Sequence, residues 1–135
     1  MTETKLVKTP LDELTYQIIG CAMAVHRKLG PGHREDAYQR DLQTCLTEKN
    51  ILFEAQKLFE VYSTSDDQSL IGYYIPDFVV DDKVVVEIKA LKGTDNSHLA
   101  QVIGYLAVTN CSIGLLINFG ERSLIYHRVL PPKNL

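Results

Sequence analysis

Apolar side chains recur every three or four residues along the N-terminal third of the chain, which is the spacing of an α-helix. In the segment LDELTYQIIGCAMAVHRKL (11–29) they share one face, at Leu14, Ile18, Cys21 or Ala22, Val25 and Leu29. Thr9-Pro10 suits a helix start, and Gly30-Pro31-Gly32 ends the run. The segment EDAYQRDLQTCLTEKN (35–50) resumes the same spacing. Two helices are therefore predicted.

The pattern then changes to the alternation and short apolar runs of β-strands. Residues 71–80 and 83–91 are predicted as two strands joined by a hairpin connection at Asp81-Asp82. Further strands are predicted at 53–63, 111–120 and 123–129, and a helix at 97–109 behind the cap-forming residues Gly93 to Asn96. The order ααβββαββ predicts an α/β fold in which helices flank a mixed central β-sheet.

Length and charge narrow the classes of protein that remain. The 135 residues suffice for one compact domain, expected to span residues 1–135. No apolar run approaches the ~18 residues of a membrane span, and the N-terminus lacks a signal sequence, so a cytoplasmic location without membrane contact is expected. The net charge of −3 argues against a binder that grips nucleic acid with a basic stripe. An enzyme that reaches a polyanion mainly through metal ions stays compatible.

The cysteines and histidines show no site of their own. Cys21, Cys45 and Cys111 are odd in number and far apart in sequence, and neither a CxxC nor a Cys/His cluster is present. Neither a zinc site nor a disulfide framework is predicted, and the three cysteines are expected to be small buried side chains.

Charged residues interrupt the apolar hairpin YYIPDFVVDDKVVVEIKALKG (73–93). Glu87 and Lys89 project from the same side of their strand, about 7 Å apart at ~3.3–3.4 Å per residue. A solvated sheet face would show the same alternation. The register of the hairpin decides whether Asp77 joins Glu87 in a site or whether these charges form a solvated sheet face. A two-residue turn sets Asp77 opposite Val86, on the wrong face, whereas a three-residue loop or a bulge sets Asp77 opposite Glu87. We predict the second register.

Two converging carboxylates repel each other, and a divalent cation relieves the repulsion. Such oxygen ligands suit Mg²⁺ or Mn²⁺, and a bound metal ion can activate water and stabilise charge on a phosphoryl oxygen. A neighbouring lysine can position that water or offset the developing charge. Asp77, Glu87 and Lys89 therefore indicate metal-dependent hydrolysis of a phosphodiester.

The segment Pro76-Asp77 followed by Glu87-Ile88-Lys89 resembles the signature of the PD-(D/E)XK nucleases. The segment GHREDAY (32–38) is similar to the G-x-x-E-x-x-Y motif that names the GxxExxY family within that superfamily. Together with GLLINFG (114–120), the resemblance extends from about Leu14 to Val129. It implies a restriction-endonuclease-like core and a nuclease that hydrolyses DNA with Mg²⁺ or Mn²⁺.

The resemblance also implies roles for individual residues. The metal ligands would be Asp77, Glu87, Glu35 and the carbonyl of Ile88, and Glu35 would also belong to the catalytic set. Lys89 would be the catalytic lysine. Gln101 begins a Q-x-x-x-Y helix motif and would orient the site or contact a phosphate. The tyrosines of the two motifs, Tyr38 and Tyr105, are expected in the core with hydrogen-bonded hydroxyls.

Two other functions are compatible with these residues. One is a binding or regulatory module that keeps the fold without cleaving, which the low basicity and small size favour. The other is a structural α/β domain with a polar sheet face. For the nuclease and for the binding module, a homodimer or a partner subunit could complete the grip on DNA.

Overall fold

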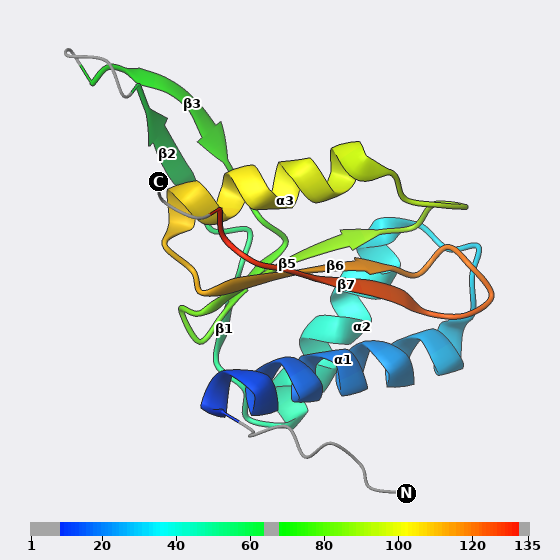
Figure 1. Ribbon diagram of the computed structural model, residues 1–135. Coiled ribbons are helices and arrows are strands. Elements are labelled where there is room, and N and C mark those ends of the chain that lie inside the picture. The colour runs from blue at the N-terminus through cyan, green and yellow to red at the C-terminus, as the bar shows by residue number, and fades with distance from the viewer. Residues whose placement is uncertain (1–8, 64–67, 133–135) are drawn as a thin grey trace, which may run out of the picture.

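The computed structural model describes residues 9–63 and 68–132 (Figure 1). Three helices and seven strands follow one another in these residues. They are α1 (Pro10–Leu29), α2 (Glu35–Glu48), β1 (Phe53–Ala55), β2 (Phe59–Tyr62), β3 (Leu70–Tyr74), β4 (Phe78–Val80), β5 (Val84–Lys89), α3 (Asn96–Thr109), β6 (Ile113–Asn118) and β7 (Ile125–Val129).

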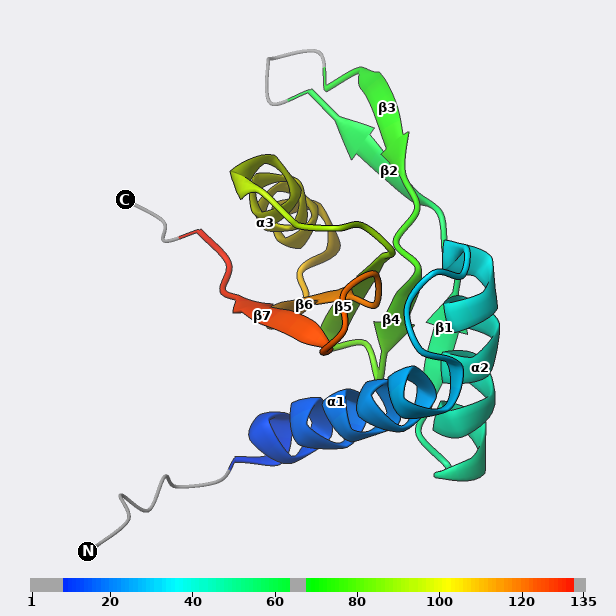
Figure 2. The ribbon, with the colours of Figure 1, turned by 90° about the vertical axis from the view of Figure 1, so that its right-hand side faces the viewer.

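Five of the strands form one mixed sheet in the order β1-β4-β5-β6-β7. β5 and β6 are parallel, and the other pairs are antiparallel. Helices α1 and α2 cover one face of the sheet, and α3 covers the other (Figures 1 and 2). Val86 and Ile88 of β5 point into the core beneath α1 and α2, whereas Val85 points toward α3. The predicted fold class, a mixed sheet flanked by helices, is confirmed.

The helix boundaries follow from local capping. Thr9 is the N-cap of α1, where its hydroxyl accepts from the Asp12 N–H while the Asp12 carboxylate accepts from the Thr9 N–H. Gly30 ends the helix with a φ of 69°, a conformation that a glycine adopts without strain. Both ends of α1 agree with the sequence prediction. Asp95 caps α3 in the same way and engages His98, so the side chain of His98 has a local structural role.

Two predicted strands are each divided in two, which corrects the predicted order. Residues 53–63 form β1 and β2, separated near Gln56, whose φ of 58° leaves the extended region. Residues 71–80 form β3 and β4, separated at Pro76, which has no N–H to donate to a ladder. β1 and β4 stay in the central sheet, while β2 and β3 pair with each other as a separate two-stranded arm beside α3 (Figure 2).

The β4–β5 hairpin has the register that the sequence analysis predicts. Phe78 pairs with Val86 and Val80 with Val84, so residues 81–83 form a three-residue loop. Asp81 and Asp82 both have positive φ values, 51° and 55°, which aspartate tolerates better than most residues. One further step along this register sets Asp77 opposite Glu87, on the side of the sheet that faces α3.

Within the described residues, no helix is both long and apolar enough to cross a membrane.

Candidate active site

Two backbone N–H groups hold the carboxyl groups of Asp77 and Glu87 across the hairpin. The Asp77 N–H donates to Glu87 Oε1 at 3.1 Å, and the Ile88 N–H donates to Asp77 Oδ2 at 2.7 Å. The strand break at Pro76 lies directly before Asp77 and ends the β3 pairing there. The backbone of each strand thus anchors one carboxylate oxygen of the other strand, which places the two carboxyl groups side by side.

Burial raises the pKa values of both carboxyl groups, and the charge of Asp77 also raises that of Glu87. The pKa of Glu87 rises to about 7, first because the side chain is buried and second because of the negative charge of Asp77. Burial also raises the pKa of Asp77, against the lowering effect of the Ile88 N–H. Glu87 is 8% exposed. A cation between these two groups would remove the repulsion that raises the pKa of Glu87.

Lys89 and Glu35 both act electrostatically on this pair. The positive charge of Lys89, at the end of β5, lowers the pKa values of both Asp77 and Glu87. Glu35 is the first residue of α2, and its negative charge raises the pKa of Asp77. Figure 1 shows the N-terminal end of α2 beside the C-terminal end of β5. The side chain of Glu35 is exposed, and its helix α2 covers the face of the sheet opposite α3 (Figure 2).

No group of three or more His, Cys, Asp and Glu side chains in residues 9–63 and 68–132 is arranged to hold a metal ion. Asp77 and Glu87 form a two-carboxylate centre, and Glu35 contributes its charge from farther away. In an extended strand the N–H and the carbonyl of one residue lie on the same edge. The Ile88 carbonyl is therefore on the edge where its N–H meets Asp77.

Tyr74 is a site residue that the sequence analysis missed. Its hydroxyl donates to Glu87 Oε1 at 3.3 Å, and its ring stacks on Tyr105 of α3. Burial raises the pKa of Tyr74, and the charge of Glu87 raises it further, so the hydroxyl stays protonated and keeps donating. Both hydrogen bonds to Glu87 end on Oε1. Among the described contacts, Oε2 is the oxygen left for a cation.

The two tyrosines also connect Gln101 with the site. Gln101 lies one turn before Tyr105 on α3, and its side chain lowers the pKa of Tyr105. Tyr105 in turn stacks on Tyr74, which holds Glu87. Gln101 is exposed, so its amide is open to a ligand above the sheet. Tyr105 is partly buried and packs against the core beneath α3, and the expectation that its hydroxyl is hydrogen-bonded stays a prediction.

Asn118 and Gly120 are the second feature that the sequence analysis missed, and they hold the end of β5. Asn118 is 1% exposed; its Oδ1 accepts from the Leu91 N–H at 2.9 Å and its Nδ2 donates to the Leu91 carbonyl at 3.0 Å. A Cβ on Gly120 would lie 2.3 Å from the Leu91 backbone, so only glycine fits there. The Phe119 N–H donates to the Lys89 carbonyl at 2.8 Å. These contacts fix the backbone at Lys89 and at Leu91, just after the end of β5.

Tyr38, the last residue of the G-x-x-E-x-x-Y segment, has a structural role. Its hydroxyl donates to the Gly30 carbonyl at 2.6 Å and accepts from the His33 N–H at 3.2 Å. Its ring is buried and stacks on Phe119. Tyr38 therefore fixes the turn between α1 and α2, and Glu35 is the first residue of α2 after this turn. The prediction that Tyr38 is a core residue with a hydrogen-bonded hydroxyl is confirmed.

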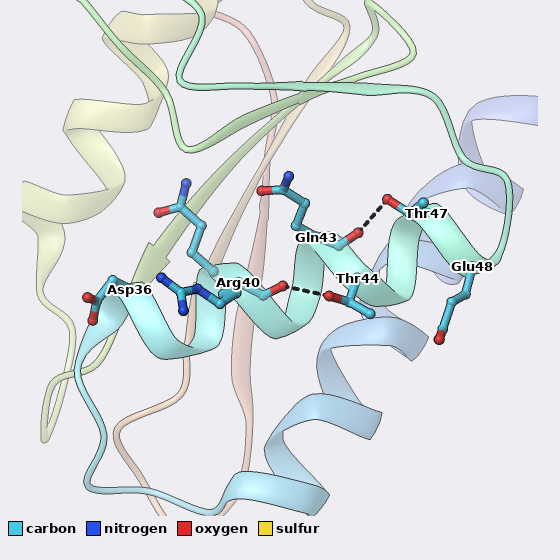
Figure 3. Close-up of a pocket in the computed structure, with 7 residues that line it drawn as sticks. Asp36, Arg40, Gln43, Thr44, Thr47 and Glu48 are labelled. Atoms are coloured by element: carbon cyan, nitrogen blue, oxygen red, sulfur yellow. Dashed lines mark hydrogen bonds between the residues drawn. The ribbon is translucent and has the colours of Figure 1, made fainter.

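A hollow of about 520 Å³ lies elsewhere, along the outer face of α2 (Figure 3). Asp36, Arg40 and Thr44 line it, and the Thr44 hydroxyl donates to the Arg40 carbonyl of its own helix. Asp77 and Glu87 do not border it. Its residues lie along a single helix face, so we do not assign the chemistry to this hollow.

Comparison with known proteins identifies the family. The family model of the PD-(D/E)XK nuclease superfamily matches residues 12–129, and the chain belongs to this superfamily. No curated protein matches the sequence. The crystal structure of SSO0001 is similar with a TM-score of 0.59 and 18% identity, covering 73% of this chain and 50% of SSO0001. An alkaline exonuclease (LHK-Exo) from Laribacter hongkongensis has a TM-score of 0.48 and 15% identity, covering 94% of this chain and 73% of its own.

These findings confirm the restriction-endonuclease-like fold. The chain spans half the length of SSO0001, with which it shares the fold. Nucleases of this superfamily generally use divalent metal ions. The donor set fits such an ion, because Asp77 and Glu87 offer hard oxygen ligands whose mutual repulsion a cation would relieve.

Proposed function

We propose that this protein is a nuclease that hydrolyses phosphodiester bonds of DNA with Mg²⁺ or Mn²⁺. The observation that carries the proposal is the pair of the half-buried Asp77 and the buried Glu87, held across the hairpin by backbone N–H groups, with the charge of Lys89 acting on both. Membership of the PD-(D/E)XK superfamily supports a nuclease. The choice of DNA rests on the resemblance of the sequence motifs.

Asp77 and Glu87 are the proposed metal ligands, with the Ile88 carbonyl as a further one. Mg²⁺ keeps several waters and commonly binds proteins through one or two carboxylates together with substrate phosphates, so a two-carboxylate centre suits it. Glu35 is proposed to act on the metal-bound water or to join the ligands from the end of α2. When bound, the ion would lower the pKa of a coordinated water and stabilise charge on the phosphoryl oxygen.

The other residues orient the reactants. Lys89 holds the attacking water and offsets the negative charge that develops on the phosphate. Gln101, exposed on α3 one turn before Tyr105, contacts a phosphate oxygen or orients that water. Tyr74 and the backbone N–H of Asp77 keep the Glu87 carboxylate in one orientation. This arrangement needs little adjustment during the reaction, which is the usual source of electrostatic catalysis.

We also assign the chain to the GxxExxY family. The supporting observation is that two residues of GHREDAY have different roles. Tyr38 fixes the turn between α1 and α2, and Glu35 is the first residue of α2. We further propose that residues 1–135 form a single domain and that the protein is located in the cytoplasm.

The proposal is tested by incubating the purified protein with linear, nicked and single-stranded DNA, and with RNA, in Mg²⁺, Mn²⁺ or EDTA. Wild type should cleave at least one DNA substrate in Mg²⁺ or Mn²⁺ and none in EDTA. Lys89→Ala and Asp77→Ala should each lower the rate at least about 100-fold, whereas Lys92→Ala, at an exposed lysine nearby, should cleave as wild type does. Wild type no more active than Lys89→Ala on every substrate would sink the nuclease proposal.

A second function, binding without cleavage, is favoured by one observation. The chain has 17 acidic and 14 basic residues, a poor balance for gripping a polyanion unaided. A module of this kind would depend on a homodimer or a partner subunit for its grip. DNA binding without cleavage by the wild type in all three conditions would point to this function.

A further inference from the structure

We propose that Cys21 and Cys45 form an oxidation site, at which a hydroperoxide converts the two thiols into a disulfide that joins α1 to α2. The Cys45 thiol donates to Cys21 Sγ across 2.7 Å, although 24 residues separate the two positions in sequence. Both are free thiols. Cys21 and Cys111 are buried as the sequence analysis expects, whereas Cys45 is partly exposed and in contact with Cys21.

The helices hold the thiols together through apolar packing. Cys21 is fully buried in the core shared by α1 and α2, and Cys45 packs against that core from α2. The hydrogen bond between Tyr38 and Gly30 closes the turn between these helices. The native fold therefore supplies the proximity that disulfide formation otherwise has to gain at an entropic cost.

Cys45 is the thiol that an oxidant reaches first. It is partly exposed and lines a cleft of about 200 Å³ between α1 and α2, across which Lys28 and Asp41 form an ion pair at 3.9 Å. Cys21 has no exposure, and burial raises its pKa to about 12, which makes it a slow nucleophile toward reagents in solution.

The reaction balances in two steps. The Cys45 sulfur attacks one oxygen of the hydroperoxide, the O–O bond breaks, and Cys45 becomes a sulfenic acid while the peroxide leaves as an alcohol or water. The Cys21 sulfur then attacks the Cys45 sulfur, the S–O bond breaks, and the hydroxide leaves as water with the proton of Cys21. Two electrons pass from the thiols to the peroxide, which is the only oxidant required.

The disulfide would close a loop that contains the whole GHREDAY segment and Glu35. It would hold α2 on α1 without touching Asp77 or Glu87. The expected physical consequence is a stiffer α1–α2 pair and a higher melting temperature, because the link restricts the unfolded chain. This consequence is independent of the proposed nuclease activity.

The test treats the full-length folded protein with hydrogen peroxide, then denatures it and alkylates the remaining thiols. Wild type should lose about 2 Da, the two thiol hydrogens, and retain one alkylated cysteine, Cys111. A non-reducing digest should link the peptides that carry Cys21 and Cys45. The melting temperature should rise by roughly 10 °C and return on reduction.

Matched variants separate this site from general oxidation. Cys111→Ser should form the same link as wild type. Cys21→Ser should stop at a sulfenic acid on Cys45, which dimedone traps, and Cys45→Ser should form no link within the chain. Three alkylated cysteines after peroxide, or a link that uses Cys111, would overturn the proposal whether or not the protein cleaves DNA.

Discussion

Burial and repulsion act on the same carboxyl group at Glu87. The side chain is only 8% exposed, and burying an ionisable group there costs more free energy than burying a neutral one. Tyr74 and the Asp77 N–H both donate to one of its oxygens and favour the ionised form, but burial and the charge of Asp77 outweigh them. The free protein therefore carries an electrostatic penalty at neutral pH that a bound cation would remove.

This penalty predicts a pH-dependent stability difference between wild type and Glu87→Gln. The pKa of Glu87 is about 7 in the folded protein, above the ordinary value of 4.5 that applies to the unfolded chain. The raised pKa favours the folded state below pH 4.5, and this advantage is lost as the pH rises through 7. Glutamine stays neutral and can accept the same hydrogen bonds. In EDTA at pH 8, Glu87→Gln should be about 2–3 kcal/mol more stable than wild type.

Urea unfolding at pH 5 and pH 8 measures this difference. The gain should shrink at pH 5, and adding Mg²⁺ at pH 8 should stabilise wild type but not Glu87→Gln. Glu54→Gln, at an exposed glutamate of β1, serves as the control and should show little change with pH. Equal stabilities of wild type and Glu87→Gln at pH 8 would mean that the ionised Glu87 side chain does not destabilise the folded protein.

The sequence allowed the two carboxylates to be predicted but not the residues that support them. The alternation in β5 and the three-residue loop after β4 suffice to set Asp77 opposite Glu87. Tyr74 reaches Glu87 only because the chain breaks at Pro76 and turns β3 into a separate arm. No spacing along the chain encodes that contact, since it depends on how two sheets are placed.

At the scale of elements, the end of β5 depends on the end of β6. Asn118 accepts from and donates to the Leu91 backbone, and Phe119 donates to the Lys89 carbonyl. Parallel pairing brings these segments together, with Lys89 opposite Asn118. The strand that carries Lys89 is therefore held in place by residues about 30 positions away in sequence. Asn118 left one visible sign in the sequence, a polar residue at the end of an apolar strand.

The same junction predicts a sharp difference between two glycine substitutions. In Gly120→Ala the new Cβ would lie 2.3 Å from the Leu91 backbone, so the β5 end must shift; the expected loss of stability is about 3 kcal/mol. In Gly104→Ala, within α3, the new Cβ meets nothing within 4 Å, and the helix should gain about 0.5–1 kcal/mol. Urea denaturation curves of both variants test this. A Gly120→Ala protein as stable as wild type would show that the junction can relax.

The predicted strands were too long for a comparable reason. Alternation continues through 53–63 and 71–80, so a pattern of side chains cannot show where a strand leaves one sheet and enters another. The backbone does show it, at the positive φ of Gln56 and at the ring of Pro76. The proline was part of a recognised motif, but its effect on pairing became clear only with the structure.

At the scale of the whole molecule, charge sets the terms for binding nucleic acid. The chain carries a net charge of −3, and its candidate site is built around two carboxylates, the buried Glu87 and the half-buried Asp77. Both features repel phosphate in the absence of a cation. The net charge follows from the composition alone and does not depend on the fold. It follows that affinity for DNA should depend on a divalent ion as much as catalysis does.

The last prediction concerns that dependence. Lys89→Ala leaves the carboxylate pair intact while disabling the proposed chemistry, so it can be mixed with labelled DNA in Mg²⁺ without loss of the substrate. Fluorescence anisotropy should show binding at least about 10-fold tighter in Mg²⁺ than in EDTA at the same ionic strength. Mg²⁺ lowers the DNA affinity of proteins that bind only through basic residues, because it screens the phosphates. A rise in affinity therefore identifies a cation shared by the carboxylates and a phosphate. The double variant Lys89→Ala, Asp77→Ala should lose the Mg²⁺ effect, and equal affinity of Lys89→Ala in Mg²⁺ and EDTA would contradict it.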